Sequence, residues 1–528
     1  MRNNSFYLLL ITLIFNKYLI ENIFLIYYRE DRNLFIFFYL LLFIIEYIFY
    51  IYYIFEYKKV NDRVYFFRSW MMGSYSNFFS QTEGNKWTSS KIVKERLKYG
   101  DLYINNFKFD DDVINKFYFF SLRKKFENFK CKINTKDLTK STIVFGQMGS
   151  GKSEFLYSLL KQNTMNRYLI FDSKGDFTQK FYSSKRDIIL NPYDSRSSIW
   201  NPFEEAELNP YIVEIFFTNL LNSIAGDKKD FFSASTKERY MDIFYEVLYK
   251  KSELNAKQKL SIYVKELKRY FSEVSKSNSK SENDVISTMK LLFEFIEYMD
   301  FKVQNGCKTF TISNFIITNN SKLFLLARDD LKSKLNPFFT AFIAIFASIL
   351  LSRPDNKANL TGLFLDEYLT FAKNLDEETL EGLHTRIRSK GGCLITAIQY
   401  FPKAKYEELT QKILNSSNYL FLFQGIDTYT LDIINKTVGK VRYKKDSLKK
   451  NNKSFYNNES FNTEETNLLN TTMFHSLAEK FEHITYIPSK KLLYKGYTNE
   501  IKSVKRNLAF VFDKKSLSRF YREYKDKN

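Results

Sequence analysis

Two long apolar stretches stand near the start of the chain. Residues 34–55 carry a single charge, Glu46, and residues 5–28 form a second apolar stretch interrupted by polar side chains. A helix rises about 1.5 Å per residue, so residues 34–55 can span a hydrocarbon core of roughly 30 Å. A buried soluble helix or a cleaved signal peptide is the less favoured alternative. The pattern predicts a transmembrane helical hairpin over residues 1–56, and the basic residues that follow place the remaining chain in the cytoplasm: Lys58, Lys59, Arg63 and Arg68.

Further along, a β-branched and aromatic run, Thr142–Phe145, leads into a glycine-rich loop and then an amphipathic pattern. The loop matches G-x-x-x-x-G-K-[ST], a phosphate-binding signature when it lies between a strand and a helix. Lys152 is expected to reach the β- and γ-phosphates of ATP, and Ser153 to ligate Mg²⁺. The predicted nucleotide-binding residues are Gly146, Gln147, Met148, Gly149, Ser150, Gly151, Lys152 and Ser153.

A second strand, Gly362–Leu365, ends in an acidic pair. Ligands of α/β sheets bind at the carboxyl ends of strands. Asp366 is therefore predicted to hold Mg²⁺ through water. Glu367 is predicted to deprotonate the water that attacks the γ-phosphate. An adjacent Asp-Glu pair favours a hydrolysing motor over a kinase.

A third strand begins at Gly392 and ends in Gln399, whose amide is predicted to sense the γ-phosphate. Just before this strand stand Arg386 and Arg388. In a ring of subunits, one of them could reach the neighbour's nucleotide as an arginine finger; the alternative is that both are ordinary surface arginines.

The stretch YLIFDSKGDF reads as another buried strand that opens into a charged loop. We expect this strand beside that of the phosphate loop, so that its charges link the nucleotide state to the next subunit or to a pore. The alternative is a salt-bridged structural loop. The candidate coupling motif comprises Asp172, Lys174, Gly175 and Asp176.

The rest of the chain suggests a nucleotide-binding domain in two parts, over residues 57–229 and 309–528. Helical apolar stripes between them predict an inserted all-α domain at residues 230–308. The apolar run at 339–352 is read as a core helix. Residues 440–467, rich in Lys and Asn, are predicted to be a mobile polar insertion, and residues 507–513 a strand that closes the domain.

Composition adds a partner class. The 528 residues are 45% hydrophobic and carry a formal charge of +21. Such a basic chain suits nucleic acid or an anionic membrane surface. Lysines that accumulate on a solvated surface without a binding role explain the charge equally well. Three isolated cysteines form neither a disulfide framework nor a zinc spacing, which favours a reducing compartment.

The order of these motifs resembles the FtsK/HerA superfamily of ring-shaped DNA pumps, with Asp176 where that group has Glu. The stretch LNPYDSRSSIWNPFEE narrows the resemblance to the type IV coupling proteins, the TraD/TraG-like ATPases of conjugation. The resemblance implies a RecA-like P-loop NTPase domain with an inserted all-α domain, and a homohexamer at the inner membrane. It favours Arg388 over Arg386 as the finger, since Arg388 stands eleven residues before Gln399.

The resemblance also implies the partners. It predicts an ATP- and Mg²⁺-dependent motor that delivers relaxase-bound single-stranded DNA, gripped without sequence preference, to the proteins of a type IV secretion channel. Two alternatives stay open: an FtsK/HerA-like DNA translocase, and an ATP-switched receptor that recruits secreted proteins without pumping DNA.

Overall fold

The computed structural model describes most of the chain beyond residue 77 in two compact units. The described residues are 78–84, 87–88, 90–107, 129–225, 231–274, 293–401, 407–447, 460–475, 477, 481–501 and 505–525. The predicted hairpin at residues 1–56 lies outside them. One unit combines Met1–Gly84 with Val441–Thr466, and the other combines Asn85–Lys440 with Asn467–Asn528.

In the first unit, the structure describes a three-stranded sheet in the order β1 (Phe78–Gly84), β13 (Lys440–Ser447) and β14 (Ser460–Asn467). β1 and β13 are antiparallel. The segment expected to be a mobile polar insertion thus contains two strands. In β13 the good strand formers Val441 and Tyr443 alternate with basic residues, a period-two pattern that a reading based on lysine content overlooks.

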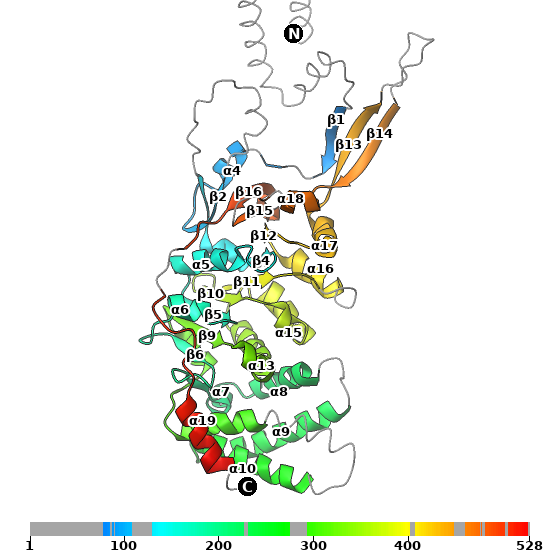
Figure 1. The fold of residues 1–528 in the computed structure, drawn as a ribbon. Helices are drawn as coiled ribbons and strands as arrows, with labels where there is room; N and C mark the ends of the chain where they lie inside the picture. The colour runs from blue at the N-terminus through cyan, green and yellow to red at the C-terminus, as the bar shows by residue number, and fades with distance from the viewer. Residues whose placement is uncertain are drawn as a thin grey trace, which may run out of the picture. The chain divides into compact units, whose positions relative to one another are not determined.

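The second unit is built on an eleven-stranded sheet (Figure 1). Its seven-stranded part from β12 to β6 is entirely parallel, and the strands at the other end pair antiparallel. In order, the strands are β3 (Phe129–Ile133), β2 (Leu102–Phe107), β16 (Leu492–Tyr497), β15 (Glu482–Ile487), β12 (Tyr419–Phe423), β4 (Thr142–Phe145), β11 (Gly392–Ile398), β10 (Thr361–Leu365), β5 (Arg167–Asp172), β9 (Ser321–Leu326) and β6 (Ile188–Leu190). The α/β class predicted from sequence is confirmed.

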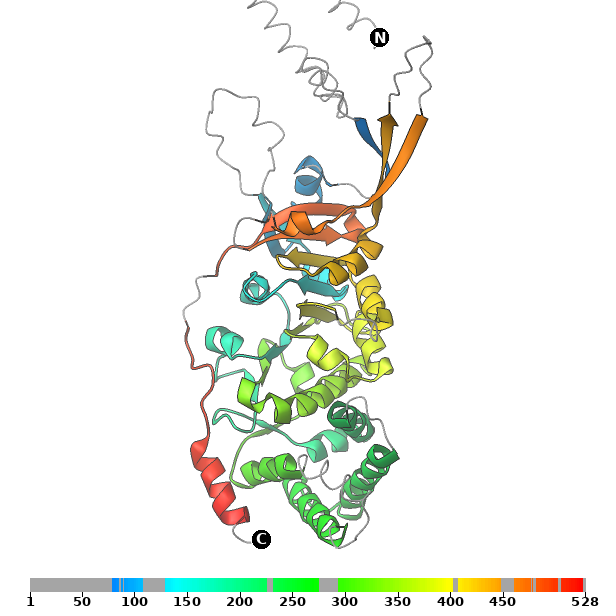
Figure 2. The ribbon, with the colours of Figure 1, turned by 45° about the vertical axis from the view of Figure 1, so that its right-hand side comes forward.

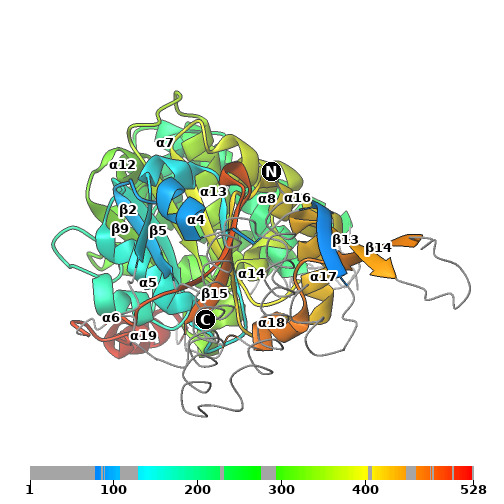
Figure 3. The ribbon, with the colours of Figure 1, turned by 90° about the horizontal axis from the view of Figure 1, so that it is seen from above.

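Five central parallel strands are buried along their whole length, because helices cover both faces of such a sheet. This explains their unbroken apolar sequences. Figure 3 looks down on the antiparallel end, with α4 (Ser90–Arg96) in front. The other helices of the sheet region are α5 (Lys152–Gln162), α6 (Asp176–Phe181), α12 (Ile312–Ile317), α13 (Lys332–Leu351), α14 (Leu369–Ala372), α15 (Glu377–Glu381), α16 (Glu407–Ser416), α17 (Thr428–Val438) and α18 (Thr471–His475).

The order of the strands corrects one expectation. The strand of the DSKGD motif, β5, was expected beside the phosphate-loop strand β4, but β11 and β10 lie between them. Neighbours along the chain are often not neighbours in a parallel sheet, since each crossover can pass over strands that are inserted later. The carboxyl ends of all four strands still lie at one edge.

Beyond the β6 end of the sheet lies an all-helical part (Figures 1 and 2). It contains α7 (Pro202–Leu208), α8 (Ile212–Ala225), α9 (Phe231–Lys250), α10 (Ala256–Val274) and a helix over residues 293–304. The predicted apolar stripes of α9 and α10 face each other, with Tyr240, Phe244 and Tyr263 buried. The boundaries 230–308 stay a prediction; the described residues of this interval are helical apart from the turns at 251–255 and 305–308.

One described helix is apolar enough over Lys334–Leu351 to cross a membrane by length and composition. It belongs to α13, and most of it is buried in this unit, chiefly against α8. Its place in the fold agrees with the reading of the apolar run 339–352 as a core helix.

At the C-terminus, residues 505–513 are extended and lead into α19 (Lys514–Phe520). The predicted strand at 507–513 is wrong: this segment makes one isolated bridge, between Asp194 and Phe512, instead of joining the sheet.

Candidate phosphate-binding site

The glycine-rich loop joins the end of β4 to the start of α5, as predicted. Its first residues are fixed to both neighbouring strands: Gly146 N–H donates to the Ile398 carbonyl at 3.2 Å, and Gln147 N–H to the Gln424 carbonyl at 3.0 Å. Gly149 has a φ of 79° with open space where a side chain would begin. The backbone therefore curls ahead of a helix N-terminus, the arrangement that binds phosphate groups.

Lys152 lies at the first position of α5 and is buried. Its ammonium group donates to two carbonyls of its own loop, those of Gly146 and Gln147, the latter at 2.8 Å. Burial lowers its pKa, while the charge of Asp366 works in the opposite direction. A buried cation held only by neutral carbonyl groups is ready to accept an anion, so the loop fits a phosphate.

The acidic pair follows β10 directly. An Asp366 carboxylate oxygen accepts from the Glu367 N–H at 3.0 Å. Burial, together with the neighbouring Glu367 charge, raises the pKa of Asp366, and Lys152 opposes this shift. Asp366 and Lys152 thus act on each other electrostatically, as the predicted metal and phosphate ligands should.

The residues present fit Mg²⁺ only as part of a larger ligand set. Among the residues that the structure describes, no group of three or more His, Cys, Asp or Glu side chains is placed to hold a metal. Ser153 and Asp366 would supply two oxygen ligands. Mg²⁺ commonly takes its remaining oxygens from substrate phosphates and water, so this small protein set suits a nucleotide-bound ion.

Glu367 makes a contact that the sequence did not indicate. Its backbone has a φ of 54°, and its carboxylate lies 3.3 Å from the Lys332 ammonium at the start of α13. Lys332 also pairs with Asp329 at 2.7 Å. Thirty-five residues separate Lys332 from Glu367, and neither spacing nor composition marks Lys332 as special.

Gln399 follows the last residue of β11, and β11 pairs directly with β4. Ile398 lies opposite Phe145 and accepts from the Gly146 N–H, so the backbone of Gln399 lies beside the start of the phosphate loop. The fold brings the predicted sensor to the same edge as Lys152 and Asp366.

The two arginines lie at the opposite edge of the sheet. They precede β11, whose seven residues at about 3.3 Å each separate them from Gln399 by roughly 20 Å. Arg386 ends a π-helix (Gly382–Arg386) and is tied to the Glu378 backbone at 3.2 Å and carboxylate at 3.5 Å. Arg388 is exposed. Neither belongs to the phosphate site of its own chain.

The DSKGD motif divides between two environments. Asp172, 1% exposed, accepts from the Thr178 N–H and hydroxyl, both at 2.7 Å, and so holds the start of α6. Burial raises its pKa to about 6. Lys174 is exposed, and its charge acts on the pKa of both Lys152 and Asp366. Asp172 has the contacts of a structural group, whereas Lys174 reaches the phosphate site electrostatically.

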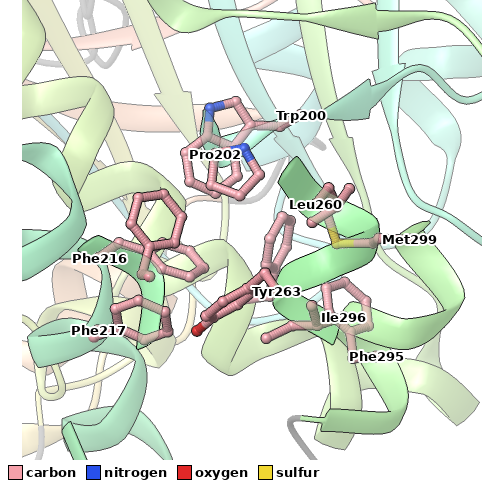
Figure 4. A pocket seen from close by; sticks show the side chains of 11 residues that line it. Trp200, Pro202, Phe216, Phe217, Leu260, Tyr263, Phe295, Ile296 and Met299 are labelled. Atoms are coloured by element: carbon pink, nitrogen blue, oxygen red, sulfur yellow. The ribbon is translucent and has the colours of Figure 1, made fainter. Parts of the chain in front are cut away.

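The Asn191–Phe203 segment lies elsewhere. Trp200 and Phe203 are buried, and Phe203 stacks on Phe244 of α9 with ring centres 4.1 Å apart. Figure 4 shows Trp200 on the wall of an apolar pocket together with side chains of the all-helical part. This segment therefore joins the sheet to the helices.

The chain matches one protein-family model over residues 130–468, that of the type IV secretion-system coupling protein DNA-binding domain. It belongs to this family. The resemblance drawn from the motifs is confirmed, and the matched range includes every predicted site residue.

One curated relative is coupling protein TraD of Escherichia coli (strain K12), 25% identical over 274 residues, which are 48% of this chain and 37% of TraD. The match thus spans little more than a third of that relative. Among the solved structures that share the fold are two of plasmid coupling protein TrwB. The complex with the GTP analogue GDPNP has a TM-score of 0.59 at 16% identity, covering 83% of this chain and 99% of TrwB. The complex with ADP and Mg²⁺ has a TM-score of 0.56 at 16% identity, with the same coverage.

Proposed function

We propose that this chain is an ATP-driven motor that couples relaxase-bound, single-stranded DNA to a type IV secretion channel during conjugative transfer. The observation that carries the proposal is the convergence of Lys152, Asp366 and Gln399 at one sheet edge in a member of the coupling-protein family. The TrwB structures, one with ADP and Mg²⁺, support the choice of ATP and Mg²⁺. The net charge of +21 suits a partner with many phosphates.

Each residue at this edge has a task in hydrolysis. The loop N–H groups and Lys152 bind the β- and γ-phosphates and stabilise the charge that develops on them. Ser153 and Asp366 would hold Mg²⁺, which neutralises phosphate oxygens when bound. Glu367 accepts a proton from the attacking water while the bond between the γ-phosphorus and the bridging oxygen breaks, leaving ADP and phosphate. Gln399 senses the departing γ-phosphate.

The assembly is proposed to be a homohexamer in the inner membrane, anchored by residues 1–56 with the remainder in the cytoplasm. The placement of Arg388 supports a shared site. Strand β11 lies between Arg388 and the nucleotide site of its own chain, and the Arg388 side chain is exposed. Arg386, in contrast, is tied to Glu378. Arg388 therefore acts on the neighbour's γ-phosphate. Arg388→Ala in a mixed oligomer should inactivate the adjacent subunit's site; full activity of that site would contradict the role.

The deciding experiment measures ATP hydrolysis by the full-length protein in detergent, with and without single-stranded DNA. We expect hydrolysis that DNA stimulates and salt weakens. Glu367→Gln should reduce kcat by about 10²- to 10⁴-fold while ATP still binds, because only the base is lost. Glu377→Gln, at an exposed carboxylate of α15, is the matched control.

Other outcomes would favour the alternatives. Hydrolysis without any response to DNA would favour an ATP-switched receptor for secreted proteins. DNA transport without a relaxase or secretion channel would favour an FtsK/HerA-like translocase. An active Glu367→Gln protein would contradict the proposed chemistry.

A further inference from the structure

The last described segment of the chain, residues 505–525, lies beyond the range that the family model matches; we call it the C-terminal strap. Its start is attached to α6, which follows the DSKGD motif. The N–H groups of Arg506 and Asn507 donate to the Gln179 carbonyl at 2.9 and 3.2 Å. The Asn507 amide donates to the Tyr182 carbonyl at 2.8 Å. In Figure 2 the strap, in red, continues from there to the all-helical part.

The middle of the strap is held by the Asn191–Phe203 segment. Asp194 is fully buried and accepts from the Val511 N–H at 2.9 Å, and the Val511 carbonyl accepts from the Ser195 N–H at 2.8 Å. The Arg196 guanidinium pairs with Asp194 at 2.7 Å and donates to the Leu508 carbonyl at 2.9 Å. The Asp194 and Arg196 side chains are therefore a docking site for the strap.

The end of the strap is anchored in the helices. Asp513 forms an ion pair with Lys302. Phe520 of α19 is 1% exposed and packs edge-on against Tyr298 and Phe301, with ring centres 5.2 and 5.5 Å away. The strap thus connects α6 near the phosphate site to the helix at 293–304.

Between these attachments the strap contacts the chain just after β9. The Arg328 guanidinium lies 4.8 Å from the centre of the Phe510 ring and 5.8 Å from that of Phe512. Such contacts attract through the ring quadrupole. Arg328 also pairs with Asp330, which fixes the short turn that leads into α13.

Four residues after Arg328, that turn delivers Lys332 to Glu367. Burial alone would lower the pKa of Lys332, but Asp329 and Glu367 outweigh it and raise the pKa above its ordinary value. The ammonium therefore stays charged. A general base works only when its carboxylate is aimed at the water, and active sites commonly use a third group to orient the base. Among the described residues, Lys332 is the only one that forms an ion pair with Glu367.

We propose that Lys332 is the positioning residue for Glu367, and that the C-terminal strap holds Lys332 in place through Arg328. The strap thereby links the all-helical part to the aim of the catalytic carboxylate. This inference rests on the proposed role of Glu367 as the base.

The first test compares Lys332→Ala with Lys332→Arg and with Lys334→Ala, an exposed lysine two residues further along α13. In the full-length protein, Lys332→Ala should lower kcat by about ten- to a hundredfold, the scale of a misaimed catalytic group. The Kd for a non-hydrolysable ATP analogue should not change. Lys332→Arg should restore most of kcat. Unchanged or increased kcat in Lys332→Ala would overturn the inference.

The second test addresses the strap. The double variant Phe510→Ala/Phe512→Ala should lower kcat, whereas Leu508→Ala, at a side chain that is 67% exposed, should not. Combined with Lys332→Ala, the double variant should cause no further loss, since both act on one carboxylate. If the two decreases in kcat multiply in the combined variant, the strap does not act through Lys332.

The roles of Glu367 and Lys332 can be tested separately. If Glu367→Gln turns over ATP like the unaltered protein, the base assignment falls, and the role of Lys332 with it. If Glu367→Gln is inactive while Lys332→Ala keeps full kcat, only the positioning role falls.

Discussion

The phosphate-binding edge and the Asn191–Phe203 segment are both rich in charged and turn-forming residues, yet they use them in opposite ways. At the phosphate edge, Lys152 meets only neutral carbonyls, so its charge is available to a ligand. In the segment, every oxygen of Asp194 is occupied, by Arg196 and by the strap. Charge that the fold leaves unpaired favours binding, and charge that the fold pairs fully favours architecture.

The largest expected effect is on activity at the phosphate edge. Lys152→Ala should lower kcat/KM for ATP by about 10²- to 10³-fold, because it removes a cation from the developing phosphate charge. Unfolding should change little, since the side chain is held by only two loop carbonyls. Lys161→Ala, an exposed lysine on the same helix, is the control. Steady-state hydrolysis and urea unfolding measure the two effects, and strong destabilisation by Lys152→Ala would blur the distinction.

The main effect of Asp194→Ala should be on stability. The substitution leaves Arg196 partly buried without its partner and frees the strap, which should cost about 3–5 kcal/mol of unfolding free energy. The fluorescence of buried Trp200 during urea unfolding reports this loss. Under conditions where the variant stays folded, ATP binding should be retained; loss of binding would place Asp194 in the phosphate site.

The pH dependence of Asp172 sharpens the same contrast within one motif. Its pKa is raised from about 3.8 in the unfolded chain to about 6, so unfolding releases a proton between these values. Below about pH 4 the carboxyl is largely protonated in both states, so its burial does not lower the free energy of unfolding. As the pH rises, this free energy falls, by on the order of 3 kcal/mol above pH 6. Asp172→Asn should lack this dependence. Parallel stability curves for the two proteins between pH 4 and 7 would contradict the buried environment.

The smallest effect compares two glycines of nearly equal φ, Gly149 at 79° and Gly175 at 80°. Each alanine substitution incurs a left-handed strain of about 1–2 kcal/mol. A side chain at Gly149 meets open space, whereas one at Gly175 comes within 2.6 Å of the Ala509 side chain in the strap. Gly175→Ala should therefore be less stable than Gly149→Ala by about 1–2 kcal/mol in urea unfolding. Equal stabilities would mean that the strap shifts near Ala509 and makes room for the added side chain.

The sequence predicts the phosphate edge well because its chemistry is local. The loop from Gly146 to Ser153 lies within one strand–loop–helix unit, and Asp366 and Gln399 mark strand ends that a parallel sheet brings to one edge. Propensity and spacing suffice for such features. The predicted all-helical insertion follows from the same local periodicity.

The remainder depends on contacts between residues far apart in the chain. The place of β5 depends on two strands inserted beside β4, which no local pattern reveals. The pairing of Lys332 with Glu367 depends on where α13 begins. Residues 507–513 have strand-like composition, but their backbone bonds to α6 and to the Asp194 turn instead of to the sheet.

The strap also imposes an order of events on biosynthesis. Asp194 and Val511 are separated by 317 residues. At about 5–20 residues per second, a ribosome needs roughly 15–60 s to travel between them. During that interval the nascent chain holds a carboxylate whose last hydrogen-bond donor has not yet been translated. A message truncated near its 3′ end would thus yield a protein with an intact phosphate loop and an unfinished turn at Asp194, a clear target for cellular proteases.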